Sequence, residues 1–103
     1  LKCGCVNVMA PIKPNSNKEK DIEASTIANV FFNTLFTDPQ YLGNYDPYIA
    51  QQMKDIIKDG DMKTIKQKLD YFGLNFYSHF YVQADPSDKL FMGAKTNNDA
   101  GFT

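Results

Sequence analysis

Residues 69–78 read LDYFGLNFYS, a short run that is almost wholly apolar and aromatic and ends in polar groups. With the two-residue period of a strand, Phe72, Leu74 and Phe76 fall on one face. The opposite face carries a more polar set, namely Tyr71, Gly73, Asn75 and Tyr77. A strand with one apolar face and a polar carboxyl end is typical of an α/β fold, in which helices cover one face and ligands meet the strand ends.

A second strand is predicted over residues 3–9, and Pro11 and Pro14 interrupt it. The long segment between the two strands has helical periodicity, so we expect a parallel pair joined by a helical crossover. The predicted fold class is therefore α/β, with residues 1–84 as a strand–helix–helix–strand segment. Residues 85–103 are rich in polar residues and glycine, and we expect a loop-like tail there.

The first predicted helix begins at Ser16, with Glu19 three residues later in a capping-box arrangement. Its apolar residues recur at helical spacing; they are Ala24, Ile27, Ala28, Phe31 and Leu35. The Asp38-Pro39 pair is expected to end this helix, because a residue before proline avoids helical geometry.

Two further helices are predicted before the second strand. Asp46 and Pro47 open the first of them as cap and first-turn proline, and Gly60 ends it. Asp61 is expected to cap a short helix that continues to Lys68.

Composition excludes several classes of partner. The formal net charge is -1 and the 11 basic residues are all lysine, which gives no electrostatic case for nucleic acid. No apolar run approaches the length of a membrane span. We therefore predict no nucleic-acid partner, no membrane partner and no cofactor.

Cys3 and Cys5 fall on one face of the first strand. A Cys-x-Cys pair can bind a metal, but His79 is the only histidine, so we predict no metal site and interpret the cysteines as small buried residues. Nothing in the sequence suggests a disulfide framework, which favours a reducing, cytoplasmic compartment.

The second strand resembles the sixth barrel strand of the family 1 glycoside hydrolases, the β-glucosidase and 6-phospho-β-glucosidase group. That strand typically reads Asp-Phe-x-Gly-x-Asn-Tyr-Tyr, and residues 70–77 read DYFGLNFY, with Phe76 in place of one tyrosine. Three upstream blocks are similar to the family in the same order. Residues 4–24 resemble its fifth strand and following helix, residues 33–39 its Phe-Leu-Asp-Pro turn, and residues 42–47 its Gly-x-Tyr-Pro segment.

The resemblance implies a fragment of a (β/α)8 TIM barrel that covers roughly the fifth to sixth barrel strands. A barrel needs about 250 residues. This chain has 103 residues and begins at Leu1 in a strand-like run, so we expect a cut piece of a longer protein. Its expected partners are the remainder of the barrel or further copies of itself, because two parallel strands alone leave their edges open.

The resemblance also implies a retaining β-glycosidase, whose two catalytic carboxylates lie about 5–5.5 Å apart. In the family these acids belong to an Asn-Glu-Pro motif and a Thr-Glu-Asn-Gly motif, and neither motif occurs here. The only glutamates are Glu19 and Glu23, at the start of the first predicted helix, where they complement its dipole. We therefore expect no catalytic residue in this chain and no activity from it alone.

The expected contribution of this chain is support for the site. The second aromatic of the family's Asn-Tyr-Tyr donates a hydrogen bond to the nucleophilic carboxylate and lies close to the sugar ring oxygen. Tyr77 matches that position and Asn75 matches the motif asparagine, so both are candidate substrate-binding residues. His79 is expected in a solvated loop, and Tyr41 and Tyr45 are expected to pack on the outer helices.

The sequence leaves the substrate branch open between β-glucosides and 6-phospho-β-glucosides. Asn7 lies one place before the asparagine that many β-glucosidases carry, so no substrate contact is assigned to it. The pattern of Gly4-Cys5, Met9 and the following prolines leans slightly toward the 6-phospho branch. The alternative function is an autonomous small α/β binding or structural module without catalysis.

Overall fold

The computed structural model describes residues 1–85, residue 87 and residues 94–97. The chain divides into two compact units, each built from two separate stretches of sequence. The strand-pair unit comprises Leu1–Met9 and Phe32–Phe76. The helix–sheet unit comprises Ala10–Phe31 and the described residues from Tyr77 onward. The predicted boundary between residues 84 and 85 stays a prediction.

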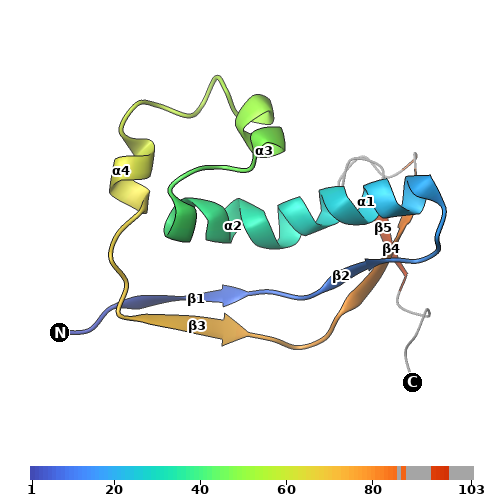
Figure 1. The fold of residues 1–103 in the computed structure, drawn as a ribbon, viewed down its shortest axis with the longest axis horizontal. Coiled ribbons are helices and arrows are strands. Elements are labelled where there is room, and N and C mark those ends of the chain that lie inside the picture. Colours follow the sequence, from blue (N-terminus) through green and yellow to red (C-terminus); the bar gives the residue numbers. More distant parts are fainter. Residues whose placement is uncertain (86, 88–93, 98–103) are drawn as a thin grey trace. The chain divides into compact units, whose positions relative to one another are not determined.

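Two parallel strands form the sheet of the strand-pair unit. Strand β1 (Gly4–Val8) pairs with β3 (Tyr71–Asn75) in a register that places Gly4 beside Tyr71 and Val8 beside Asn75. Figure 1 shows the two arrows side by side and pointing the same way. The predicted parallel pair is confirmed.

Glycines allow β1 and β3 to pack closely on the face that carries Tyr71. A methyl group added at Gly4 would lie 2.5 Å from the Tyr71 carbonyl oxygen and 2.6 Å from its ring. A methyl group at Gly73 would lie 2.6 Å from Val6 Cγ2. Each glycine thus accommodates the larger residue beside it on the partner strand.

The first helical stretch is longer than the sequence predicts. Helix α1 (Glu19–Asn29) runs directly into a π-helical turn (Val30–Thr34), helix α2 (Leu35–Thr37) and a second π-helical turn (Asp38–Leu42). The expected stop at Pro39 is wrong, because Pro39 falls in the first turn of the wider segment, where its missing N–H costs little. The stretch ends at Gly43, whose left-handed φ of 78° lets its N–H donate to the Asp38 carbonyl at 3.0 Å.

The next two helices are shorter than expected. Helix α3 (Pro47–Gln52) has the predicted cap, since the Tyr48 N–H donates to Asp46 Oδ1 at 2.9 Å. It does not continue to Gly60, because Ile49 is its only buried side chain, whereas Ile56 is 68% exposed.

Helix α4 (Asp61–Ile65) stops short of Lys68. Its N-cap is Gly60 rather than Asp61, and the Asp61 carboxylate instead accepts a hydrogen bond from the Lys58 N–H at 2.9 Å. The predicted cap at Asp61 is therefore wrong, although the helix begins at that residue.

The helix–sheet unit contains a second sheet, which the sequence does not predict. Its strands are β2 (Ile12–Pro14), β4 (Phe80–Ala84) and β5 (Ala94–Asn97), in the order β2–β4–β5. The pair β2–β4 is parallel and the pair β4–β5 is antiparallel. Pro14 is tolerated because β2 is an edge strand.

The expected tail is not a loop throughout, since β5 lies within it. Pairing with β4 decides this, because β5 has only polar or small residues and no apolar alternation of its own. The rest of the predicted tail beyond Asp85, apart from Ser87, lies outside the described residues.

One face of β4 packs against α1. The buried residues Ala24, Ala28 and Val82 form this core, and Ile12 and Ala84 pack against it. Val82 is only 1% exposed, so it is the centre of the unit. The small alanines on α1 let the helix approach the sheet closely.

Asp21 replaces the predicted capping box at the start of α1. The Ser16 hydroxyl donates to Asp21 Oδ2 at 2.5 Å, and the Ala84 N–H donates to Asp21 Oδ1 at 2.9 Å. These two hydrogen bonds, that of Ser16 first, hold the pKa of Asp21 below its ordinary value of 3.8 against the opposing effect of desolvation. Glu19 does not complete the expected box, and the N-cap is Lys18 with no side-chain cap.

Candidate functional site

Asn75 lies at the carboxyl end of β3, where the sequence places the site. Its carbonyl accepts a hydrogen bond from the Met9 N–H at 3.1 Å, which extends the pairing of the two strands by one step beyond β1. Its side chain is exposed and lies on the same face of the pair as Tyr71 and Val8. The amide of Asn75 is therefore available to a ligand at the strand ends.

The opposite face of the strand pair contacts the helical layer. The Phe72 ring packs edge-to-face on Tyr41, with centroids 5.5 Å apart, as expected for a tyrosine on the outer side. Asn7 is 9% exposed and exchanges two amide hydrogen bonds with Gln40, at 3.2 and 3.4 Å. Asn7 thus has a structural partner on the helix side, which agrees with leaving it out of the substrate contacts.

The open face of the strand pair is apolar except at its carboxyl end. Val6, Val8 and Tyr71 are each about half exposed there. In a closed barrel, helices cover the outside and the side chains of the open face point inward. The face that carries Asn75 is therefore the one that would line such a barrel.

Tyr77 follows β3 and belongs to the helix–sheet unit. Its side chain is 79% exposed, so its hydroxyl is not sealed among other side chains. Asn75 and Tyr77 thus fall in different units, and both are exposed.

His79 is not the solvated loop residue that we expected. Its half-buried ring packs edge-to-face on Tyr81, with centroids 5.4 Å apart, and its carbonyl accepts a hydrogen bond from the Ser78 hydroxyl at 3.0 Å. The alternation of His79 and Tyr81 in the sequence could have signalled this contact.

Glu19 and Glu23, the two glutamates of the chain, are exposed on α1. Cys5 is half-buried, but Cys3 is exposed, so the expectation of two buried cysteines holds only in part. Within residues 1–85, 87 and 94–97, no cluster of three or more His, Cys, Asp or Glu side chains could hold a metal ion.

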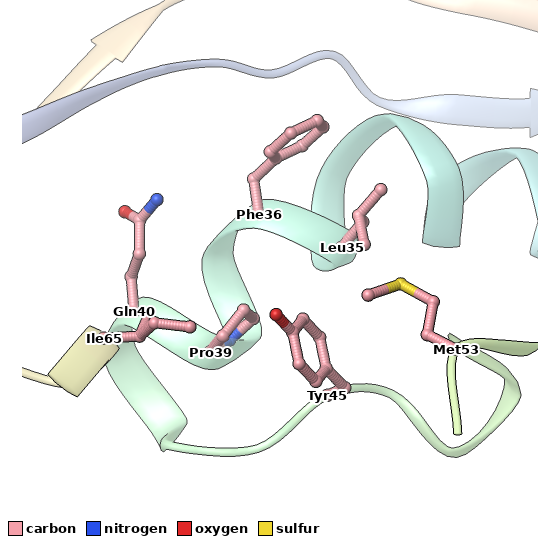
Figure 2. Close-up of a pocket in the computed structure, with 7 residues that line it drawn as sticks. All are labelled: Leu35, Phe36, Pro39, Gln40, Tyr45, Met53 and Ile65. Carbon is pink, nitrogen blue, oxygen red and sulfur yellow. The ribbon is translucent and has the colours of Figure 1, made fainter. Parts of the chain in front are cut away.

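A hollow of about 390 Å³ opens in the strand-pair unit on its helical side (Figure 2). It is lined by Leu35, Phe36, Pro39, Gln40, Tyr45, Met53 and Ile65. Tyr45 points into this hollow beside Pro39, so it belongs to the helical layer as expected. The lining holds no carboxylate and one amide, which makes it unsuited to cleaving a sugar.

A smaller, polar hollow of about 270 Å³ lies in the helix–sheet unit, at the start of α1. Asp21, Lys18 and Gln83 are among its lining residues. The Asp21 carboxylate already accepts two hydrogen bonds there, so its role is structural.

In the part of the chain that the structure describes, no helix is long and apolar enough to cross a membrane.

The sequence matches the model of a family described as glycosyl hydrolase family 1 over residues 2–102. A 1,4-beta-D-glucan glucohydrolase of Thermotoga neapolitana is 34% identical over 90 residues, which cover 84% of this chain and 21% of that protein. A 6-phospho-beta-glucosidase of Bacillus subtilis is 31% identical over 93 residues, covering 81% of this chain and 19% of that protein. The chain thus spans about a fifth of the length of these curated relatives.

Solved structures of the same group superpose well. The GH1 beta-glucosidase of Exiguobacterium antarcticum matches with a TM-score of 0.79 and 26% identity, covering 89% of this chain and 22% of that one. A family 1 b-glucosidase of Thermotoga maritima matches with a TM-score of 0.77 and 30% identity, covering 94% of this chain and 22% of that one. The similarity thus includes most of this chain and a limited part of each enzyme.

Proposed function

This chain belongs to glycosyl hydrolase family 1, and from that membership we propose that it is a segment of a retaining β-glycosidase that hydrolyses β-glucosides or 6-phospho-β-glucosides. The fold is that of a segment of the family's (β/α)8 barrel, as predicted, with β1 and β3 as neighbouring parallel barrel strands. The match over residues 2–102 is the observation that carries the proposal.

The proposed role of the segment is to position groups at the mouth of the barrel. Catalysis requires two carboxylates that flank the glycosidic bond. The chain has two glutamates, Glu19 and Glu23, both exposed on α1, and lacks the family's two acid motifs. We therefore assign bond cleavage to acids outside these residues and propose that the chain alone is inactive.

Tyr77 is the proposed hydrogen-bond donor to the nucleophilic carboxylate. Its exposed side chain and the motif match support this role. Asn75, which matches the motif asparagine, is proposed as a substrate contact. A phenol that donates to the carboxylate orients it and favours its anionic form. A hydrogen bond to a charged group is worth about 1.5–3 kcal/mol, or roughly tenfold to over a hundredfold in rate if it is made in the transition state.

β-Glucosides are the preferred substrate class within this proposal. The Thermotoga neapolitana relative is named for 1,4-β-D-glucan, and the solved structures are named β-glucosidases. The Bacillus subtilis relative and the pattern around Gly4 and Cys5 support 6-phospho-β-glucosides as the second candidate. A cytoplasmic location is part of the proposal, and the two free cysteines agree with it.

The test uses the enzyme that contains this chain, assayed with aryl β-glucoside and aryl 6-phospho-β-glucoside. We expect Tyr77→Phe to lower kcat by about tenfold to a hundredfold with little change in melting temperature. Tyr71→Phe is the matched control, since it removes a hydroxyl from the amino end of β3, the strand that precedes Tyr77 in the chain. Equal kcat for wild type and Tyr77→Phe would refute the assignment of Tyr77.

The same assay separates the alternatives. An enzyme that cleaves neither substrate would contradict the proposed function and favour the binding or structural module. Turnover by the purified 103-residue chain would contradict the claim that the acids lie elsewhere.

A further inference from the structure

A pair of side-chain amides joins β1 to the helical layer near the carboxyl end of the strand. The Asn7 amide donates to Gln40 Oε1 at 3.2 Å, and the Gln40 amide donates back to Asn7 Oδ1 at 3.4 Å. Asn7 is buried, and Gln40 is half-buried in the second π-helical turn, Asp38–Leu42. Both residues belong to the strand-pair unit, so this reciprocal contact lies within one unit.

Apolar residues flank the amide pair on the helix-facing side of the strands. Leu74 lies beside Asn7 in the register, and Phe72, two residues earlier, lies on the same face. Tyr41, which follows Gln40 in the chain, packs on Phe72. Apolar contacts have no preferred direction, so they allow a strand to slide against a helix. The amide pair requires a set distance and angle, and it therefore determines where the end of β1 lies.

The carboxyl end of β1 in turn holds Asn75. Val8 follows Asn7 and lies beside Asn75 in the register, and the Met9 N–H donates to the Asn75 carbonyl at 3.1 Å. Side chains alternate along a strand, so Asn7 faces the helices while the Asn75 side chain lies on the open face. A shift of Asn7 against the helical layer would therefore move the backbone of Asn75 with it.

We propose that Asn7 and Gln40 are positioning residues for the Asn75 amide. Their hydrogen-bonded pair fixes the carboxyl end of β1 against the helical layer, and the pairing of β1 with β3 passes that position on to Asn75. The pair faces the helices, so neither residue is proposed to contact the substrate. This inference rests on the proposed glycosidase function and on Asn75 as a substrate contact.

The test exchanges the two amides in the enzyme that contains this chain. It measures kcat/KM with aryl β-glucoside or its 6-phospho form, whichever wild type cleaves. Asn7→Gln lengthens one arm of the pair by a methylene group, and Gln40→Asn shortens the other. We expect each single variant to lower kcat/KM about threefold to tenfold, the effect of losing a hydrogen bond between neutral groups at Asn75. The double variant restores the combined length and should recover most of the loss.

A second measurement asks whether the effect passes through Asn75. In an Asn75→Ala background the positioned amide is missing, so Asn7→Gln should change kcat/KM by less than about twofold. Asp46→Ala is the control for lost stability, because it removes the cap of α3 in the same unit, and it should leave kcat/KM near the wild-type value. If Asn7→Gln fails to fold, Gln40→Asn takes its place in the cycle.

The outcomes distinguish this inference from the function on which it rests. If wild type cleaves neither aryl substrate, the proposed glycosidase function fails. If wild type is active, three results would each refute the positioning role while the function stands. They are a wild-type kcat/KM in both single variants, an equal loss with and without the Asn75 amide, and a loss in Asp46→Ala as large as that in Asn7→Gln.

Discussion

The close approach of β1 and β3 predicts that Gly73→Ala destabilises the enzyme and that Val6→Ala rescues it. The added methyl group would lie 2.6 Å from Val6 Cγ2, well inside van der Waals contact, and 3.1 Å from the Cys5 carbonyl oxygen. Overpacking of this kind costs about 1–3 kcal/mol of unfolding free energy. Truncating Val6 to alanine removes the nearest clashing atom and leaves two milder contacts, with the Cys5 carbonyl oxygen and, at 3.2 Å, with the Cα atom of residue 6.

A second glycine provides the contrast. A methyl group at Gly4 would lie 2.5 Å from the Tyr71 carbonyl oxygen as well as 2.6 Å from the ring. Tyr71→Ala removes the ring but not the carbonyl, so it should rescue Gly4→Ala poorly. The two pairs are cross-strand neighbours in the same sheet, which makes them matched cases.

The assay is urea unfolding of the enzyme that contains this chain, for each single variant and each double variant. For Gly73→Ala with Val6→Ala, we expect the double variant to be more stable than the sum of the singles predicts, by about 1 kcal/mol or more. For Gly4→Ala with Tyr71→Ala, the coupling should be clearly smaller. Equal coupling in the two pairs would refute the reasoning, because it would mean that the carbonyl contact does not matter.

Three other predictions concern a carboxylate, an amide pair and the open face. Because hydrogen bonds hold the pKa of Asp21 low, the stabilisation that it contributes is present above its ordinary pKa of 3.8 and is lost as pH falls through the folded pKa. Asp21→Asn should therefore weaken the dependence of stability on acid pH in a pH series, and Glu23→Gln, on the same helix, should not. Asn7→Leu should cost about 1–3 kcal/mol by leaving the Gln40 amide unpaired, and adding Gln40→Leu should recover part of that loss in a denaturant melt. The isolated chain should self-associate through the face that exposes Val6, which sedimentation would detect, and a monomer with a sharp melt at high temperature would argue the opposite.

Local signals predicted much of the strand-pair unit. The alternation of apolar and polar residues in β3 is a property of adjacent residues, and Phe72 indeed contacts the helical layer while Asn75 lies on the other face. The Asp46 cap depends on a neighbouring backbone group, and it formed as predicted. The roles of Asn75 as a substrate contact and of Tyr77 as a hydrogen-bond donor to the nucleophile are inferred from a motif match, and they stay a proposal.

One error has a local cause: Pro39 is expected to end a helix, but it lies in the first turn of a π-helical segment, where its missing N–H costs little. The other errors arose where a distant partner decides the conformation. Strand β5 exists because β4 offers it a partner, and its own residues give no strand signal. The capping box at Ser16 lost to Asp21, which also reaches the Ala84 N–H far along the chain.

By itself the sequence determined the family, the parallel strand pair and the absence of both acid motifs, because each depends on residue type and order. Only the tertiary structure decided that Asn7 pairs with Gln40 and that Tyr77 is exposed. These features depend on which parts of the backbone come together in the folded chain, and the local sequence around each residue says little about that.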